Sequence, residues 1–255
     1  MKKIYLYGNW KMNMTCAETK DFFVKMSSAI EDVAISGHLE SELEIAVFPA
    51  YTSIAAAMAG KGRVIVGAQN VYYEHKGAFT GEISIPMLSE LGCTHVIIGH
   101  SERRQIFKES NELLAHKLKA VLDAKLTPVF CYGETLEERD SGRTFDVFNE
   151  QLTSGISKLS KDEILRVIFA YEPVWAIGTG KSATSVEASD ACKYSRDLIF
   201  KLSNGAERII ILYGGSVKPD NAKELLSMPD INGVLVGGAS LKVESFLDIY
   251  KAYKN

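Results

Sequence analysis

Three ionisable side chains stand directly after short apolar runs in this 255-residue sequence: Lys11, His100 and Glu172. A carboxylate can take a proton from carbon, a neutral imidazole can donate a hydrogen bond to a carbonyl oxygen, and a lysine supplies a fixed positive charge. Beside a phosphate-binding element, these groups suit proton abstraction next to the carbonyl group of a small sugar phosphate. The sequence therefore predicts an aldose–ketose isomerase that works through an enediolate.

The segment AYEPVWAIGTGKSAT, residues 170–184, allows another interpretation of the region around Glu172, because its GKS triplet at 180–182 resembles the end of a nucleotide-binding P-loop. That motif needs a glycine five residues before the triplet, where this sequence has Trp175. In addition, Glu172 and Pro173 separate the loop from its strand. We therefore interpret Glu172 as an acid/base residue at the end of a strand.

Two glycine pairs also follow apolar runs: Gly214-Gly215, with Ser216 next, and Gly237-Gly238. Glycine lets the backbone approach a ligand closely, so that main-chain N–H groups can point at an anion. A single pair would favour the alternative of an ordinary tight turn. Two pairs at neighbouring strand ends, the second leading into a helix, favour a phosphate site.

Short runs of β-branched and aromatic residues alternate along the chain with amphipathic helical patterns. The runs are apolar throughout, which is typical of parallel strands buried on both faces. Thr184 and Glu187 have the spacing of a capping box at the start of one helix. Eight strands alternating with helices predict an α/β fold with one (β/α)8 barrel over residues 1–255. A doubly wound open sheet is the alternative, but no GxGxxG follows the first strand. The expected strands are Ile4–Gly8, Leu43–Phe48, Val64–Ala68, Val96–Gly99, Pro128–Tyr132, Val167–Tyr171, Ile209–Tyr213 and Val234–Val236.

His100 and His95 lie at opposite ends of one expected strand. His100 lies near the start of the segment GHSERRQIF, which is typical of a helix start, and the positive end of a helix favours a neutral imidazole. His95 comes before the strand, so we expect it at the end of the barrel that serves stability rather than chemistry. The other three histidines lack the spacing of metal ligands. Glu134 follows the fifth strand and is a second carboxylate on the chemical face.

Composition argues against several kinds of partner. The formal net charge is −3, so we do not expect the clustered basic surface of a protein that binds nucleic acid or anionic membranes. No apolar stretch approaches the roughly 18 residues of a membrane-spanning helix, and the first apolar run is too short for a signal peptide. The four cysteines show no CxxC spacing. We expect a cytoplasmic protein with free thiols, no metal and no cofactor.

At this point the sequence resembles a known family, the triosephosphate isomerases, nearly from end to end. The resemblance rests on GNWKMN, GHSERR, AYEPVWAIGTGKSAT, YGGSV and LVGGASL, which occur in the order and spacing of that family. It implies a single (β/α)8 TIM barrel that interconverts dihydroxyacetone phosphate and D-glyceraldehyde 3-phosphate in glycolysis and gluconeogenesis. It also implies no metal or other cofactor.

The resemblance assigns a role to each matching residue. Glu172 corresponds to the base that moves the proton, and His100 to the electrophile that polarises the carbonyl group. Lys11 and Asn9 correspond to the polar groups that bind substrate and stabilise the enediolate. Glu102 corresponds to a carboxylate that supports these groups from behind. The backbone N–H groups expected to hold the phosphate are those of Gly178, Ser216, Gly237 and Gly238.

Two longer segments also match the family. Pro173–Lys181 resembles the flap that closes over the phosphate, with Lys181 as a hinge residue. Asn70–Thr80 resembles the loop that inserts into a neighbouring subunit, so a homodimer is expected through this loop and Thr80. Tyr132 departs from the pattern, because we expect a small or aliphatic residue there.

Two rival functions remain open at this stage. One is another phosphosugar isomerase or synthase on the same barrel, which would prefer longer sugar phosphates. The other is a catalytically silent barrel with a structural or binding role. A silent barrel is expected to lack one of the three residues Lys11, His100 and Glu172, and all three are present.

Overall fold

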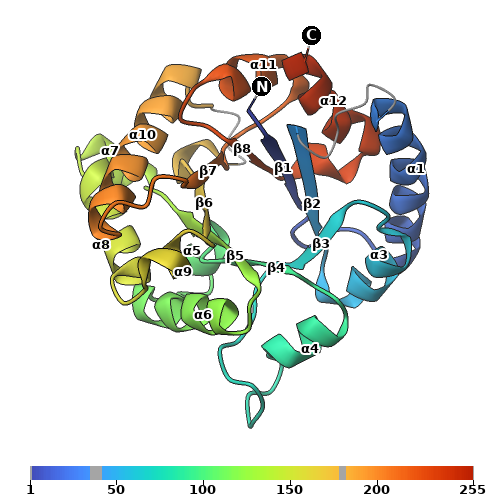
Figure 1. Ribbon diagram of the computed structural model, residues 1–255, viewed down its shortest axis with the longest axis horizontal. Coiled ribbons are helices and arrows are strands. Elements are labelled where there is room, and N and C mark those ends of the chain that lie inside the picture. Colours follow the sequence, from blue (N-terminus) through green and yellow to red (C-terminus); the bar gives the residue numbers. More distant parts are fainter. Residues whose placement is uncertain (1, 35–41, 178–181, 255) are drawn as a thin grey trace.

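Eight parallel strands form a closed barrel, in which each strand pairs with the next along the chain and β8 pairs with β1 (Figure 1). The computed structural model describes residues 2–34, 42–177 and 182–254. Helices connect the strands and surround the barrel on its outside. The predicted (β/α)8 barrel is therefore confirmed, and the doubly wound open sheet is wrong.

Each predicted strand is present, with its ends shifted by no more than one residue. Asn9 is the last residue of its strand instead of the first residue beyond it. Gly99 lies outside its strand, because its φ of +76° departs from extended backbone in a direction that glycine tolerates. The strands are β1 (Ile4–Asn9), β2 (Leu43–Phe48), β3 (Ile65–Ala68), β4 (His95–Ile98), β5 (Thr127–Tyr132), β6 (Ile168–Tyr171), β7 (Ile210–Tyr213) and β8 (Gly233–Val236).

The helical segments alternate with these strands. The predicted capping box is confirmed, since the hydroxyl of Thr184 accepts from the backbone N–H of Glu187 and the Glu187 carboxylate accepts from the N–H of Thr184. The described helices are α1 (Cys16–Ala34), α3 (Ile54–Gly60), α4 (Ile85–Glu90), α5 (Ser101–Gln105), α6 (Asn111–Asp123), α7 (Leu136–Asp140), α8 (Thr144–Ile156), α9 (Lys161–Ile164), α10 (Ser185–Leu202), α11 (Pro219–Ser227) and α12 (Val243–Lys254), with short 3₁₀ helices η1 (Tyr51–Ser53), η2 (Val174–Ala176) and η3 (Gly238–Leu241).

Two apolar layers hold the barrel together. One fills its interior, where Tyr7, Phe48, Ile97 and Cys131 are among the buried side chains. The other lies between the strands and the surrounding helices. Because successive residues of a strand point to opposite faces, Cys131 belongs to the inner layer and Tyr132 to the outer one.

Tyr132, the residue that departs from the expected pattern, therefore packs away from the barrel interior. Its ring meets Phe148 of α8 edge-on at 5.3 Å between centroids, and it lies beside Tyr171 of β6 at 6.0 Å. The side chain is fully buried. A large aromatic residue is accommodated here because the outer layer at this height is itself aromatic.

His95 lies at the amino-terminal end of β4, as expected. Its Nδ1 atom is 2.9 Å from the hydroxyl of Thr94, and its ring packs against Tyr7. Burial lowers the pKa of His95 to about 4. This histidine is therefore a neutral part of the packing at the base of the barrel.

All four cysteines carry free thiols. Among the described helices, none is long and apolar enough to cross a membrane. Within the part of the chain that the structure describes, no group of three or more His, Cys, Asp or Glu side chains is arranged to hold a metal ion.

Candidate active site

A cavity of about 400 Å³ lies at the carboxyl ends of the strands. It brings together most of the residues that the sequence singled out, and an adjoining hollow is lined by Glu102 together with Lys11 and His100. Gly178 and Lys181 lie outside the described residues. The predicted residues that line the main cavity are Asn9, Lys11, His100, Glu172, Ser216, Gly237 and Gly238.

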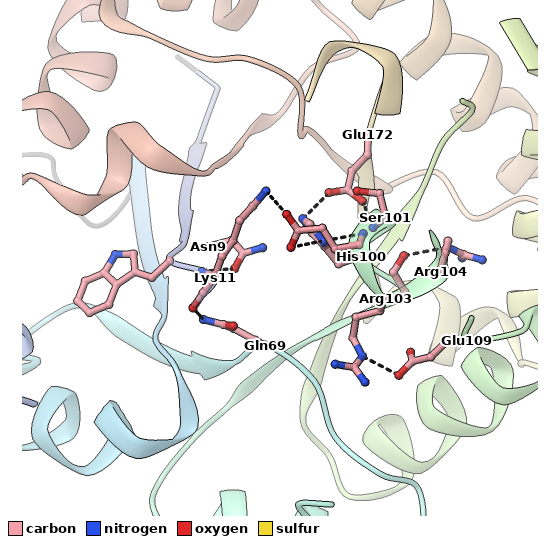
Figure 2. Close-up of polar contacts among 12 residues, drawn as sticks. Asn9, Lys11, Gln69, His100, Ser101, Arg103, Arg104, Glu109 and Glu172 are labelled. Carbon is pink, nitrogen blue, oxygen red and sulfur yellow. Dashed lines mark hydrogen bonds and ion pairs between the residues drawn. The ribbon is translucent and has the colours of Figure 1, made fainter. Parts of the chain in front are cut away.

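The carboxylate of Glu172 is held by two donors in a nearly dry position. Its Oε1 atom lies 2.9 Å from Nε2 of His100, and its Oε2 atom accepts a hydrogen bond of 2.8 Å from the backbone N–H of Ser101 (Figure 2). The side chain of Glu172 is 2% exposed, and that of His100 is 7% exposed. A carboxylate and an imidazole are thus in direct contact at the wall of the cavity.

The position of His100 defines which of its ring nitrogens carries the proton. His100 is the N-cap residue of α5, and its Nδ1 atom accepts from the backbone N–H of Glu102 at 3.2 Å. An amide N–H can only donate, so Nδ1 must present a lone pair. The remaining proton then lies on Nε2, which donates to Glu172. This geometry supports the expected neutral imidazole.

Lys11 is held in an uncommon backbone conformation. Its φ is +53°, which costs an L-amino acid about 1–2 kcal/mol. Three contacts hold it there: the backbone N–H of Lys11 donates to Oδ1 of Asn9, its carbonyl oxygen accepts from Nε2 of Gln69, and Nζ lies 2.7 Å from Oε1 of Glu102 (Figure 2). The side chain is 28% exposed, so its ammonium remains accessible from the cavity.

The loops after β7 and β8 form another part of the cavity wall. A methyl group placed on Gly238 would meet no atom within 4 Å, and one on Gly237 would lie 3.7 Å from Cε of Lys11. The β8 loop is therefore open toward the cavity and faces the lysine. Gly238 begins η3, and the first N–H groups of a helix have no acceptor within it. These features suit an anion next to Lys11.

Gly214 and Glu134 do not have the roles that their positions at the ends of strands suggested. The N–H of Gly214 donates to the carbonyl oxygen of Tyr171, so it is committed to the barrel. Glu134 is fully buried, and its Oε1 atom accepts from Nε1 of Trp175 at 2.8 Å and from the hydroxyl of Tyr171 at 3.2 Å. Glu134 thus anchors the chain just beyond Glu172 and does not line the cavity.

Three further residues in or near the site escaped the sequence analysis. Asn13 and Lys218 line the main cavity, and Ser101 supplies the N–H that holds Glu172. Lys218 follows GGSV and could have been noticed as a cation beside a phosphate loop. The contribution of Ser101 is a backbone group, which no residue type signals.

The chain is a closed (β/α)8 barrel with a buried carboxylate in contact with a histidine at the wall of a cavity. The sequence model of the family described as Triosephosphate isomerase matches residues 4–253. The triosephosphate isomerase of Syntrophotalea carbinolica is 46% identical over 98% of both chains. That of Carboxydothermus hydrogenoformans is 46% identical over 98% of this chain and 99% of its own. That of Solibacter usitatus is 47% identical over 98% of this chain and 99% of its own. The chain belongs to the triosephosphate isomerase family, and it is an isomerase.

Proposed function

We propose that this protein interconverts dihydroxyacetone phosphate and D-glyceraldehyde 3-phosphate, with Glu172 as the base and His100 as the electrophile. The observation that carries the proposal is the 2.9 Å contact between Glu172 Oε1 and His100 Nε2 beside Lys11. A base and a hydrogen-bond donor so close together can act on a carbon and on its neighbouring carbonyl oxygen in one step. The protein is proposed to act as a single domain over residues 1–255.

The reaction begins with an exchange of partners at His100. Its Nε2 atom has one hydrogen, and Glu172 accepts it in this structure. A substrate carbonyl must take that hydrogen bond to be polarised, so Glu172 must move away from His100 as substrate binds. The freed carboxylate then abstracts a proton from the carbon next to the carbonyl group and returns it to the former carbonyl carbon, while His100 moves the hydroxyl proton to the former carbonyl oxygen.

The enediolate that forms between these steps carries negative charge on oxygen. Lys11 Nζ supplies a fixed positive charge at the wall of the cavity, and Glu102 orients it through the 2.7 Å contact. Asn9 uses its Oδ1 atom to hold the Lys11 backbone, which leaves Nδ2 as the end of that amide able to donate. Pre-oriented donors of this kind stabilise charge as it develops.

The phosphate group is proposed to bind the backbone N–H groups of Ser216, Gly237 and Gly238. Gly178, which lies outside the described residues, is proposed as a fourth donor from the flap at 173–181. Support comes from the open space over Gly238 and from the loop's approach to Lys11. Closure of the flap would exclude water from the enediolate.

A homodimer is proposed through residues 70–80, including Thr80. The segment between β3 and α4 projects away from the barrel at the bottom of the view in Figure 1. Exposed apolar side chains occur on it and near the hollow beside Glu102, among them Phe79, Phe107 and Met12, which is 95% exposed. A second copy of the loop would cover this surface. Action in the cytoplasm is proposed from the family's glycolytic role.

A coupled assay with D-glyceraldehyde 3-phosphate, without added metal or cofactor, tests the proposal. The wild-type protein should turn over this substrate, and Glu172→Asp should lose on the order of 10²-fold in kcat, because shortening the side chain withdraws the carboxylate by about 1 Å. The exposed Glu207→Asp serves as a matched control and should retain full turnover.

A substrate panel separates the rivals. A preference for longer sugar phosphates over trioses would overturn the proposed substrate and favour another phosphosugar isomerase. An inactive wild-type protein would favour a structural or binding role.

A further inference from the structure

Arg104 lies behind His100, on the side away from Lys11 in Figure 2. Its guanidinium group donates three hydrogen bonds, and all three acceptors are uncharged. Nε donates to the carbonyl oxygen of Gly99 at 2.8 Å, NH2 to the carbonyl oxygen of Cys131 at 3.0 Å, and NH1 to Oδ1 of Asn111 at 2.6 Å. Arg104 therefore binds the main chain at the ends of two neighbouring strands, β4 and β5.

The two carbonyl groups lie where the pairing of β4 with β5 stops. The last paired residues of these strands are Ile98 and Phe130. At the next residue, the positive φ of Gly99 turns β4 away from β5. The guanidinium spans the opening, because a methyl group placed on Gly99 would lie only 3.0 Å from Arg104 NH2 and 3.1 Å from the Cys131 carbonyl oxygen. Arg104 thus joins the two strand ends one step beyond their last backbone pair.

Both strand ends lead directly to the residues of the reaction. Gly99 immediately precedes His100. On the other strand, Cys131 precedes Tyr132, whose carbonyl oxygen accepts the backbone N–H of Glu172 at 2.8 Å. The Gly99 carbonyl group that Arg104 binds belongs to the peptide bond with His100. The Cys131 carbonyl group that it binds is one residue before Tyr132, which holds the backbone of Glu172.

We propose that Arg104 is a positioning residue that sets the distance between His100 and Glu172 by tying the ends of β4 and β5 together. The inference rests on the proposed function of those two residues. An arginine suits the role because its planar fork presents donors in fixed directions, whereas a lysine ammonium on a flexible stem is a single point of contact. The phosphate loops after β7 and β8 lie on the other side of the cavity, so their binding does not depend on this tie.

The experiment compares Arg104→Met and Arg104→Lys with a matched control, Arg166→Met. Arg166 also donates to two backbone carbonyl oxygens, those of Leu122 and Leu126, but it lies just before β6 and does not line the cavity. For each protein, kcat, KM, the inhibition constant of inorganic phosphate and the melting temperature are measured. A crystal structure of Arg104→Met gives the distance from His100 Nε2 to Glu172 Oε1.

The expected result is a loss of kcat with little change in phosphate binding. Arg104→Met should lower kcat on the order of 10²-fold, since misplacement by about 1 Å costs that much, and Arg104→Lys should recover part of the loss. The inhibition constant of phosphate should stay within about threefold of wild type. Arg166→Met should lower the melting temperature while kcat stays within about threefold. The distance between Nε2 and Oε1 in Arg104→Met should exceed 2.9 Å.

Several outcomes would overturn the proposal. One is a kcat for Arg104→Met within about threefold of wild type. Another is an equal loss of kcat in Arg166→Met at the same loss of melting temperature, which would mean that the arginine serves stability alone. If Arg104→Met does not fold, Arg104→Lys takes its place, because an ammonium group cannot reproduce the planar fork of the guanidinium. A kcat for Arg104→Lys within about threefold of wild type would then overturn the proposal. An inactive wild-type protein would overturn the proposed function itself, and this inference with it.

Discussion

The Nε2 atom of His100 lies 2.9 Å from the Oε1 atom of Glu172, while the Nδ1 atom of His100 accepts a backbone N–H at 3.2 Å. Because the N–H of Glu102 can only donate, Nδ1 presents a lone pair, and the ring is neutral and protonated on Nε2. In the proposed reaction a substrate carbonyl replaces Glu172 at Nε2, so the proposed base leaves His100 as His100 binds the substrate. The two proposed catalytic groups share one hydrogen atom in this structure.

A first prediction concerns the protonation of His100. Nitrogen-15 NMR of the protein with a bound substrate analogue near pH 7 should show Nδ1 with the shift of an unprotonated nitrogen and Nε2 with that of a protonated one. The physical reason is the N–H of Glu102, which points at Nδ1 and cannot accept a proton from it. A doubly protonated ring at that pH would contradict the assignment.

A second prediction concerns stability at low pH and His95. Its pKa is about 4 in the folded protein, below the usual 6.5, because burial disfavours the charged ring. Above pH 6.5 the ring is neutral in both states and carries no penalty. As the pH falls from 6.5 to 4, the unfolded chain takes up a proton that the folded protein refuses, so the free energy of unfolding should fall by about 3 kcal/mol from this residue.

The measurement is chemical unfolding at several pH values, for wild type and for His95→Asn. The variant keeps a polar partner for Thr94 but has no ring to protonate, so its stability should decline less between pH 6.5 and 4. The same decline in both proteins would assign the acid sensitivity to other groups.

A third prediction concerns Gly133, which abuts the backbone of Glu172. A methyl group on Gly133 would lie 1.8 Å from the Glu172 carbonyl oxygen, a distance that forces the backbone of the base to shift. Gly133→Ala should therefore lose on the order of 10²-fold or more in kcat. Gly142→Ala is the control, because Gly142 also has positive φ but its methyl group would meet nothing within 4 Å. It should cost about 1 kcal/mol of stability and no activity. Full activity of folded Gly133→Ala would contradict the close packing.

A fourth prediction concerns the proposed dimer. Met12 is 95% exposed in the single chain, so replacing it with glutamate should be harmless unless a second copy covers it. Sedimentation analysis should show a dimer for wild type and a shift toward monomer for Met12→Glu. Val24→Glu, at a site 71% exposed on α1, should leave the dimer intact. A monomeric wild-type protein would rule out the role proposed for residues 70–80.

Most of the fold follows from the sequence, because buried parallel strands are apolar throughout and their ends are marked by glycine or polar residues. The predicted boundary at Gly99 was wrong by one residue, since a glycine can either continue a strand or turn out of it. His100, Lys11 and Glu172 could be found because each lies within two residues of the end of a strand.

The supporting contacts could not be found in that way. Glu134 also follows a strand, but it turns toward Trp175 and Tyr171, and only the packing of the following segment shows this. Arg104 binds the carbonyl oxygens of Gly99 and Cys131. Backbone acceptors on another strand leave no trace in residue types.

The central claim is that Glu172 moves a proton between neighbouring carbons of a triose phosphate. Conversion of D-glyceraldehyde 3-phosphate in heavy water, followed by proton NMR of the dihydroxyacetone phosphate formed, tests it most directly. A carboxylate that holds the proton exchanges it with solvent, so the product should carry deuterium at C1. Glu172→Gln should lower the rate on the order of 10²-fold or more, as expected for loss of a general base. Product without deuterium, together with undiminished turnover of Glu172→Gln, would contradict the account.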